Sequence, residues 1–322
     1  MKHFQSILYV SETSVEQDSA LARAVSLAEN NQAALTVIDV IPPLSAGIRL
    51  PHGGPISADL QALAVSEHRQ ALEALVAPYR TRLSIQVDVL VGLTFLETIR
   101  AVIRNAHDLV IKPAENPDFV ERLFGGDDMH LLRKCPCPVW LMKPGEKSNY
   151  QRILAAVDFD PEMPSAPEQG PNSEILELAA SLAVSDFAEL HLVHAWDTPA
   201  EMLLRSWSDN PEEAVLHYVE TERLRHKRGM DAIKSMLQER LGKEAYEYIS
   251  PRYHLTQGVA KQVIPQTAER VGADLVVMGT LARTGVRGLF IGNTAETILE
   301  QLRCSVLAFK PPGFVSPVTV SK

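Results

Sequence analysis

Short apolar runs alternate with longer amphipathic segments along the whole chain. The runs are rich in β-branched residues and lack polar alternation, which is typical of strands that are buried on both faces. Strands that alternate with helices in this way predict βαβ units and a parallel sheet. The predicted strands of the first half lie at 7–10, 35–40, 85–91, 109–112 and 139–143, and those of the second half at 153–157, 189–195, 253–256, 275–278 and 306–310.

The last strand-helix-strand unit of the chain occurs twice. Asp108-Leu109-Val110-Ile111 returns as Asp274-Leu275-Val276-Val277, and Cys137-Pro138-Val139-Trp140 returns as Cys304-Ser305-Val306-Leu307. The copies stay in register apart from one inserted residue between the two motifs. The chain is therefore a tandem duplication.

Length and composition agree with two domains. A chain of 322 residues is too long for one typical core, and 46% hydrophobic with 22% charged residues is ordinary globular composition. We place the domains at residues 1–146 and 150–313. The segment from Pro144 to Asn149 is rich in proline, glycine and polar residues, so it can join two cores without belonging to either.

Charge and cysteine content narrow the class of protein. A formal net charge of −9 disfavours nucleic-acid binding, which needs a basic face. No apolar run approaches the roughly 20 residues of a membrane span, and the N-terminal segment has no small-residue cleavage site of a signal peptide. Three cysteines fit no disulfide framework. We therefore expect a cytoplasmic protein with free thiols that binds neither nucleic acid nor membrane.

The helical segments differ between the halves. The longest helix is predicted to begin after Asn210 as its cap, with Glu213 closing a capping box, and to end at Gly242. A shorter counterpart at 57–78 follows an irregular loop at 42–55. Loops at the carboxyl ends of parallel strands are where such sheets bind ligands.

The segment before the last helix of the second copy has the chemistry of a phosphate site. Gly279 ends the fourth strand, where a missing Cβ lets a ligand approach the backbone, and Gly292 opens the helix, whose first amides are unpaired. A phosphate there would meet these amides and the side chains of Asn293, Thr294, Arg283 and Arg287. The competing interpretation is a tight turn in which Asn293 only caps the helix.

These residues resemble the pattern of the universal stress protein family, which reads Gly, two residues, Gly, nine residues, Gly, then Ser or Thr. Gly279 and Gly292 match the first and last glycines, whereas Ala282 replaces the middle glycine and Asn293 the hydroxyl residue. The resemblance covers essentially the whole chain in two copies. It implies an α/β fold of two tandem flavodoxin-like domains, each a five-stranded parallel sheet in the order 3-2-1-4-5 with helices on both faces.

The resemblance also implies a ligand and its contacts. An aspartate after strand one reads the adenine amino group in nucleotide-binding members and is matched by Asp158. The residue that packs against the base at the end of strand two is matched by Ala195. The implied site for ATP or a related adenine nucleotide comprises Asp158, Ala195, Met278, Gly279, Thr280, Arg283, Gly292, Asn293 and Thr294.

The first copy departs from this pattern. Its first strand ends in Ser11-Glu12, Pro113 stands in the place of Gly279, and its last helix opens with Gly125-Gly126-Asp127-Asp128. Two carboxylates at a helix N-terminus satisfy the dipole themselves and repel a phosphate. We therefore expect a degenerate, structural first domain.

Motifs of catalysis and metal binding are absent from the sequence. Neither a general base nor a metal-binding carboxylate cluster can be nominated near Gly292, so hydrolysis of a bound nucleotide would be slow and incidental. Cys135 and Cys137 lack the two-residue spacing of zinc and thioredoxin motifs. His191 and His194 lie three apart on a strand and point to opposite faces. The sequence predicts neither an enzyme nor a metal site.

Three functions follow as hypotheses. The first is a non-catalytic stress-response protein that binds an adenine nucleotide in its second domain. The alternatives are an interaction module without nucleotide, and a carrier of a larger, partly apolar ligand held by the long helices and the 42–55 loop. The basic stretch at 222–228 favours a solvated helix face over a partner contact.

The fifth strands predict how the copies associate. Each is an apolar strand at the edge of its own sheet, and such an edge tends to pair with another strand. We expect intramolecular pairing of the domains through these strands, so that a homodimer would use a different surface.

Overall fold

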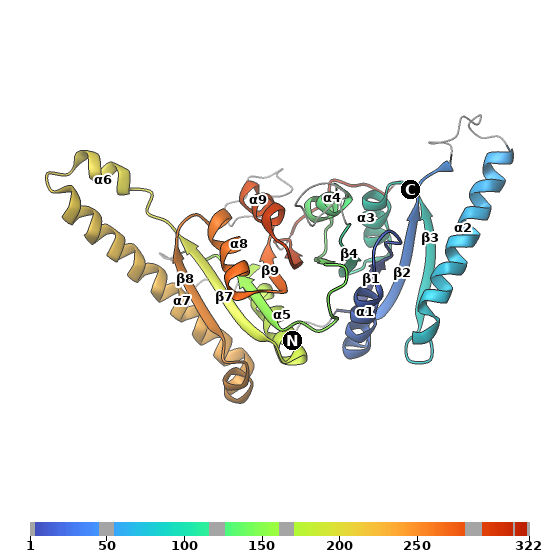
Figure 1. The fold of residues 1–322 in the computed structure, drawn as a ribbon, viewed down its shortest axis with the longest axis horizontal. Helices are drawn as coiled ribbons and strands as arrows, with labels where there is room; N and C mark the ends of the chain where they lie inside the picture. Colours follow the sequence, from blue (N-terminus) through green and yellow to red (C-terminus); the bar gives the residue numbers. More distant parts are fainter. Residues whose placement is uncertain are drawn as a thin grey trace. The chain divides into compact units, whose positions relative to one another are not determined.

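The computed structural model describes residues 4–44, 55–115, 126–160, 171–280, 292–311 and 313–320. The chain divides into two compact α/β units (Figure 1). One, the central unit, contains Tyr150–Cys304, and the other, the N-terminal unit, contains His3–Asn149 together with Ser305–Lys322. The predicted loop at 42–55 falls largely outside the described residues.

The N-terminal unit holds a parallel sheet in the order β3-β2-β1-β4-β5. This is the predicted 3-2-1-4-5 order, which is confirmed for the first copy. The strands are β1 (Ser6–Val10), β2 (Ala34–Ile41), β3 (Ile85–Val91), β4 (Leu109–Pro113) and β5 (Val139–Met142). The helices are α1 (Asp18–Asn31), α2 (Pro55–Val76), α3 (Thr94–Asn105) and α4 (Gly126–Lys134), with a 3-10 turn at Ala77–Tyr79.

A further strand of this unit comes from the end of the chain. β10 (Ser305–Phe309) pairs antiparallel with β5 and places Leu307 opposite Trp140, both fully buried. The buried Lys310 follows β10, and its ammonium donates to the carbonyls of Leu132 and Arg133 in the last turn of α4. The second copy therefore contributes its fifth strand to the unit built mainly from the first.

The central unit holds the other strands of the second copy in the order β8-β7-β6-β9, all parallel. They are β6 (Arg152–Ala156), β7 (Glu189–Trp196), β8 (Arg252–Gln257) and β9 (Leu275–Gly279). The helices are α5 (Pro171–Asp186), α6 (Glu201–Trp207), α7 (Pro211–Ile249), α8 (Ala260–Val271) and α9 (Asn293–Gln301). Because crossovers are right-handed, α5 and α7 cover one face of the sheet, and α8 and α9 the other (Figure 1).

The long helix α7 departs in detail from its prediction. It begins after Asn210 as expected, but the Asn210 side chain makes no backbone cap and its amide donates instead to Glu213 Oε2 at 2.6 Å. Gly242 interrupts the helix with φ 71° and ψ 166°, and the helix then resumes as far as Ile249. Glycine adopts a positive φ without a Cβ clash, so this residue kinks the helix rather than ending it.

Candidate functional site

A cavity of about 420 Å³ opens at the carboxyl ends of β6, β7 and β9. Its size lies within the roughly 300–1,000 Å³ of small-molecule sites. The polar side chains at its wall are Asp158, Asn172, Asn293 and Thr294. Apolar side chains form the rest of the wall: Ala156, Val157, Ile175, Ala195, Ala260, Ile264, Met278, Ala295 and Ile298.

The residues predicted for the nucleotide site meet at this cavity. All of those that the structure describes line it, glycines 279 and 292 included, except Thr280. Thr280 is buried, and its carbonyl accepts a 2.9 Å hydrogen bond from the Gly292 amide. That bond brings together the two ends of the predicted phosphate segment. Ala282, Arg283 and Arg287, within that segment, lie outside the described residues.

The helix α9 begins at the cavity wall. Gly292 is its N-cap in an extended conformation, with φ −77° and ψ 142°, and no side chain caps the helix. The first amides of α9 therefore lack intrahelical acceptors and carry the positive end of the macrodipole. This end of the cavity suits an anion.

Asn172 is a site residue that sequence reasoning missed. It lies at the start of α5, is buried, and makes two hydrogen bonds to the backbone of Asp158. Its Oδ1 accepts from the Asp158 amide at 3.1 Å, and its side-chain amide donates to the Asp158 carbonyl. Asn172 thus anchors the turn that carries Asp158. An asparagine at the start of the helix after strand one was the available signal.

A second cavity, of about 520 Å³, adjoins the first and shares Asp158, Ala195, Ala260 and Thr294 with it. Its wall adds His194 and His226. The His194 ring stacks on Phe159 with 3.8 Å between centroids, and its Nε2 lies 2.9 Å from His226 Nδ1.

His226 corrects the prediction of a solvated basic face at 222–228. Its side chain is 12% exposed and lies against this cavity. Within the same stretch, Arg223 pairs with Glu220 and Arg225 with Glu222. One part of the stretch faces inward and the other forms ion pairs along α7.

The comparison with known proteins identifies the family. The family model described as "Universal stress protein family" matches residues 3–143 and again residues 149–310. The chain belongs to the universal stress protein family.

Relatives match over the full tandem length. Universal stress protein E of Salmonella typhi is 30% identical over 329 residues, covering 99% of this chain and 98% of that protein. Universal stress protein E of Photorhabdus laumondii is 29% identical over 333 residues and all of both chains. Among solved structures, a functionally unknown protein from Pseudomonas aeruginosa PAO1 has a TM-score of 0.64 at 27% identity, covering 96% of this chain and 93% of that one.

The family fold places different side chains at the same point in the first copy. β1 pairs with β4 as β6 pairs with β9, with Ile7 opposite Leu109 and Ile153 opposite Leu275. Counting along these strands, Lys112 takes the place of Met278, and Glu12 that of Asp158. The site position of the first copy therefore carries charged groups where the second copy has a cavity wall.

These charged groups contact one another. Lys112 is fully buried, and its ammonium lies 3.0 Å from Asp128 Oδ1, 3.3 Å from Glu12 Oε2 and 3.6 Å from Glu115 Oε1. Asp128 is also fully buried, and its Oδ2 accepts from the Glu115 amide at 2.7 Å. Asp128 stands in the first turn of α4, where its charge also satisfies the helix dipole. An internal ion cluster thus occupies the position that corresponds to the cavity wall of the second copy.

The cluster shifts the pKa values of Lys112, Glu12 and Glu115. Burial disfavours the Lys112 ammonium, but Asp128, Glu115 and Glu12 outweigh it and raise the pKa of Lys112. Burial would raise the pKa of Glu12, but Lys112 and Ser14 lower it on balance. Burial and the Asp128 charge raise the pKa of Glu115 from 4.5 to about 7. One lysine cannot neutralise three carboxylates, so Glu115 holds its proton to a higher pH than an ordinary glutamate does.

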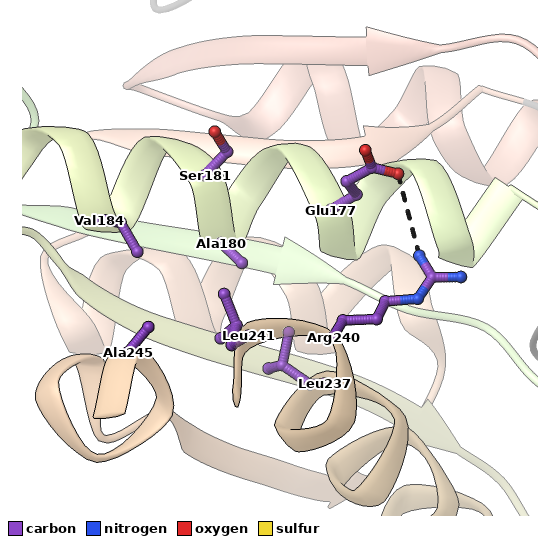
Figure 2. Close-up of a pocket in the computed structure, with 8 residues that line it drawn as sticks. All are labelled: Glu177, Ala180, Ser181, Val184, Leu237, Arg240, Leu241 and Ala245. Carbon is purple, nitrogen blue, oxygen red and sulfur yellow. Dashed lines mark ion pairs between the residues drawn. The ribbon is translucent and has the colours of Figure 1, made fainter. Parts of the chain in front are cut away.

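A cavity of about 350 Å³ lies between α5 and α7 (Figure 2). Leu237, Leu241 and Ala180 line it, and Arg240 lies 3.9 Å from Glu177 at one end. This cavity is one apolar space, among the described residues, that is compatible with the carrier hypothesis.

Cys135 and Cys137 are buried free thiols with 3.6 Å between their sulfurs. The hydrogen bond between Cys137 and Cys135, together with burial, raises the pKa of Cys137 well above its ordinary value, so this thiol is a poor nucleophile. In the part of the chain that the structure describes, no group of His, Cys, Asp or Glu side chains could hold a metal ion. None of the helices in that part is long and apolar enough to span a membrane.

We predict that Glu115→Gln stabilises the protein at pH 8, because it removes a carboxylate whose charge the other carboxylates of the cluster disfavour. The gain should be at most about 1 kcal/mol, because Glu115 is partly exposed and its charge is screened. Its folded pKa is raised, so the native glutamate contributes full stability below pH 4.5 and loses that contribution as the pH rises through about 7. Glutamine has no proton to lose. Urea unfolding at pH 4.5 and pH 8 measures the effect.

The matched control is Glu12→Gln. The folded pKa of Glu12 is lowered, so its carboxylate stabilises the fold above pH 4.5 and this contribution is lost as the pH falls. Glu12→Gln should therefore lower stability at pH 8. The same sign for both variants would contradict the ion-cluster account.

Proposed function

We propose that the protein is a non-catalytic stress-response protein that binds ATP or a related adenine nucleotide in the central unit. The observation that supports this most directly is the gathering of Asp158, Ala195, Met278, Gly279, Gly292, Asn293 and Thr294 at a single cavity. The glycine segment and the family pattern indicate these positions from the sequence alone. They come from separate strands and helices of the central unit, so local sequence similarity does not by itself bring them together.

The groups along the cavity follow the order of the parts of a nucleotide, with contacts for a base at one end and contacts for phosphate at the other. Asp158 supplies an acceptor for an exocyclic amine, and Ala195 with Met278 offers the small, apolar wall that a base ring requires. At the other end lie the free amides of α9 and the side chains of Asn293 and Thr294, which suit phosphate oxygens. Arg283 would add a cation for the phosphate tail.

The first copy is proposed to have no nucleotide site. Lys112 and Asp128 form a buried ion pair where Met278 and the cavity stand in the second copy. A phosphate there would meet Asp128, Glu12 and Glu115, and like charges repel at short range.

The alternatives predict different ligands. An interaction module would be purified empty, and a carrier would release a partly apolar molecule. Mass spectrometry of ligand released from the purified protein separates these outcomes from a bound adenine nucleotide.

We expect calorimetric titration with ATP to give one site per chain, in the second copy. Gly292→Val should abolish binding, because a branched side chain at the helix start would block the amides. The matched control is Gly126→Ala, since Gly126 begins α4 and an added Cβ there meets nothing within 4 Å. Two equivalent sites, or loss of ATP binding in the control alone, would overturn the asymmetry between the copies.

Asp158→Ala should weaken ATP by roughly 10- to 100-fold, because hydrogen bonds to charged groups contribute about 1.5–3 kcal/mol. GTP is the control ligand, since it presents a carbonyl where adenine presents its amine, and its affinity should not fall. Titration of both nucleotides measures the ratio. Unchanged ATP affinity in the variant would remove Asp158 from the site.

We also propose that the two domains, at 1–146 and 150–313, stay joined within one chain through their fifth strands. β5 and β10 pair in an antiparallel ladder of buried residues, with Ala308 opposite Val139. A homodimer would then use another surface.

Val139→Cys with Ala308→Cys tests this pairing and changes side-chain volume little. In a background whose native cysteines are replaced by alanine, oxidation of the dilute protein should give an intramolecular disulfide. Non-reducing electrophoresis and mass spectrometry detect it. Only intermolecular products, or none, would show that the strands do not remain paired in solution.

A further inference from the structure

The amino edge of the central sheet carries a cluster of charged groups and histidines that the nucleotide proposal does not use. A cavity of about 600 Å³ lies there, at the first residues of β6, β7 and β8 and the last turn of α8. It is at the opposite end of the strands from Asp158. The side chains that matter are Arg152, Glu189, His191, Arg252, His254 and Arg270.

Strand register brings these side chains together. Arg152 lies opposite Glu189, and His191 lies opposite Arg252. Alternate residues of a strand share a face, so Glu189 and His191 point the same way on β7, as Arg252 and His254 do on β8. Because α8 runs back from the carboxyl edge to the amino edge, its last turn adds Arg270 to the same cavity.

Three arginines line this cavity against two carboxylates, those of Glu189 and Glu269. Glu189 lies 3.2 Å from Arg252 and 3.4 Å from His191 Nε2, so it serves those two groups. Within the described part of the chain, no carboxylate is within ion-pair distance of Arg152 or Arg270, and the latter donates only to Thr267 Oγ1 at 3.4 Å. Two guanidinium groups therefore face the cavity without an anionic partner.

The histidine pair reports a positive environment. The rings of His191 and His254 stack with 5.2 Å between centroids, and His191 Nδ1 lies 2.9 Å from His254 Nε2. Burial lowers the pKa of both histidines. For His191, the hydrogen bond and charge of Glu189 raise the pKa while Arg252 and Arg152 lower it, and the net shift is downward. For His254, the neighbouring His191 and then Arg270 and Arg252 lower the pKa further. A bound anion would offset these charges and favour protonation of the pair.

The end of α8 does not cancel this charge. A helix C-terminus is the negative end of the macrodipole, but here two of its last four carbonyls, those of Ala268 and Glu269, have donors. The Gly272 amide bonds the carbonyls of Ala268 and Glu269, and the Ala273 amide bonds Ala268 as well. Gly272 does this in a left-handed conformation with φ 62°. Arg270 in the last turn adds the compensating charge.

We propose that this cavity binds a compact phosphate-bearing anion through Arg152 and Arg270, with the His191–His254 pair as a further donor. Guanidinium groups bind phosphate oxygens in bidentate fashion, and two such groups favour a ligand with more than one charge. The source is either free pyrophosphate or the phosphate tail of a nucleotide. The site is independent of the proposed adenine cavity, since the two share no lining residue.

The test is calorimetric titration of inorganic pyrophosphate at low ionic strength into Gly292→Val, where the other phosphate position is blocked. One saturable site is expected. Arg152→Gln with Arg270→Gln should weaken binding at least tenfold, and both side chains are exposed, so the fold should persist. Arg223→Gln is the matched control, because Arg223 is an exposed arginine of the same unit that is paired with Glu220.

ADP titrated into the same variants distinguishes the sources. Tighter binding of ADP than of pyrophosphate indicates a nucleotide tail, and equal or weaker binding indicates the free anion. Absence of saturable pyrophosphate binding, or equal loss in Arg223→Gln and the double variant, would overturn the proposal. Neither result bears on ATP binding at the cavity of Asp158, which is measured in the unmodified protein.

Sulfate provides the pH arm, because its charge is constant over the range used. The groups that face the histidines are Arg152 from β6, Glu189 from β7, Arg252 from β8, and Glu269 with Arg270 from α8. Both histidine pKa values lie below 6.5 in the free protein, so anion binding should take up protons as the pH falls through 6.5. We expect at least threefold tighter sulfate binding at pH 5.5 than at pH 7.5, with histidine NMR shifts that follow saturation. A flat pH profile with unmoved histidine signals would contradict the role of the pair.

Discussion

Everything at the candidate site depends on the parallel pairing of β6 with β9, which sets Ile153 opposite Leu275. That register fixes how far each strand reaches toward the carboxyl edge, so Asp158 and Gly279 end at the same cavity. The strands themselves are held by burial: Ile153, Leu154, Val276 and Val277 are fully excluded from solvent. A slip of one residue would exchange the side chains that pack against α5 for those that pack against α8, and the loss of complementary packing on both faces makes the register specific.

The two copies show how one register can serve two chemistries. In the second copy the positions hold Met278 and Asp158, and a cavity remains. In the first copy they hold Lys112 and Glu12, and the buried Asp128 completes an ion cluster. A buried ion pair gains little over apolar packing, but removal of one partner costs about 3–5 kcal/mol. In the first copy the ion cluster therefore fills this position, whereas in the second copy the position lines a cavity.

The opposite edges of the central sheet differ in charge. The carboxyl edge joins a carboxylate, Asp158, to the free amides of α9. The amino edge gathers arginines with two histidines of lowered pKa, beside the end of α8. The chain as a whole carries a net charge of −9, so the composition alone does not indicate this local excess of arginines.

Much of the fold follows from local pattern. Apolar runs specify strands because a parallel sheet buries both faces. The duplication and the glycines of the family motif can be read directly from the amino-acid sequence. The helix break at Gly242 also follows from sequence, since a glycine can take a positive φ where other residues are strained. By contrast, only the tertiary structure decided that Asn172 holds the turn of Asp158 and that Lys112 lies against Asp128. The pairing of the two fifth strands follows from their apolar edges, but only the structure gives its register, with Ala308 opposite Val139, and places Arg270 with Arg152 at one cavity. These contacts join residues distant in sequence, and each depends on the register and direction of paired elements, which no local pattern of apolar and polar residues encodes.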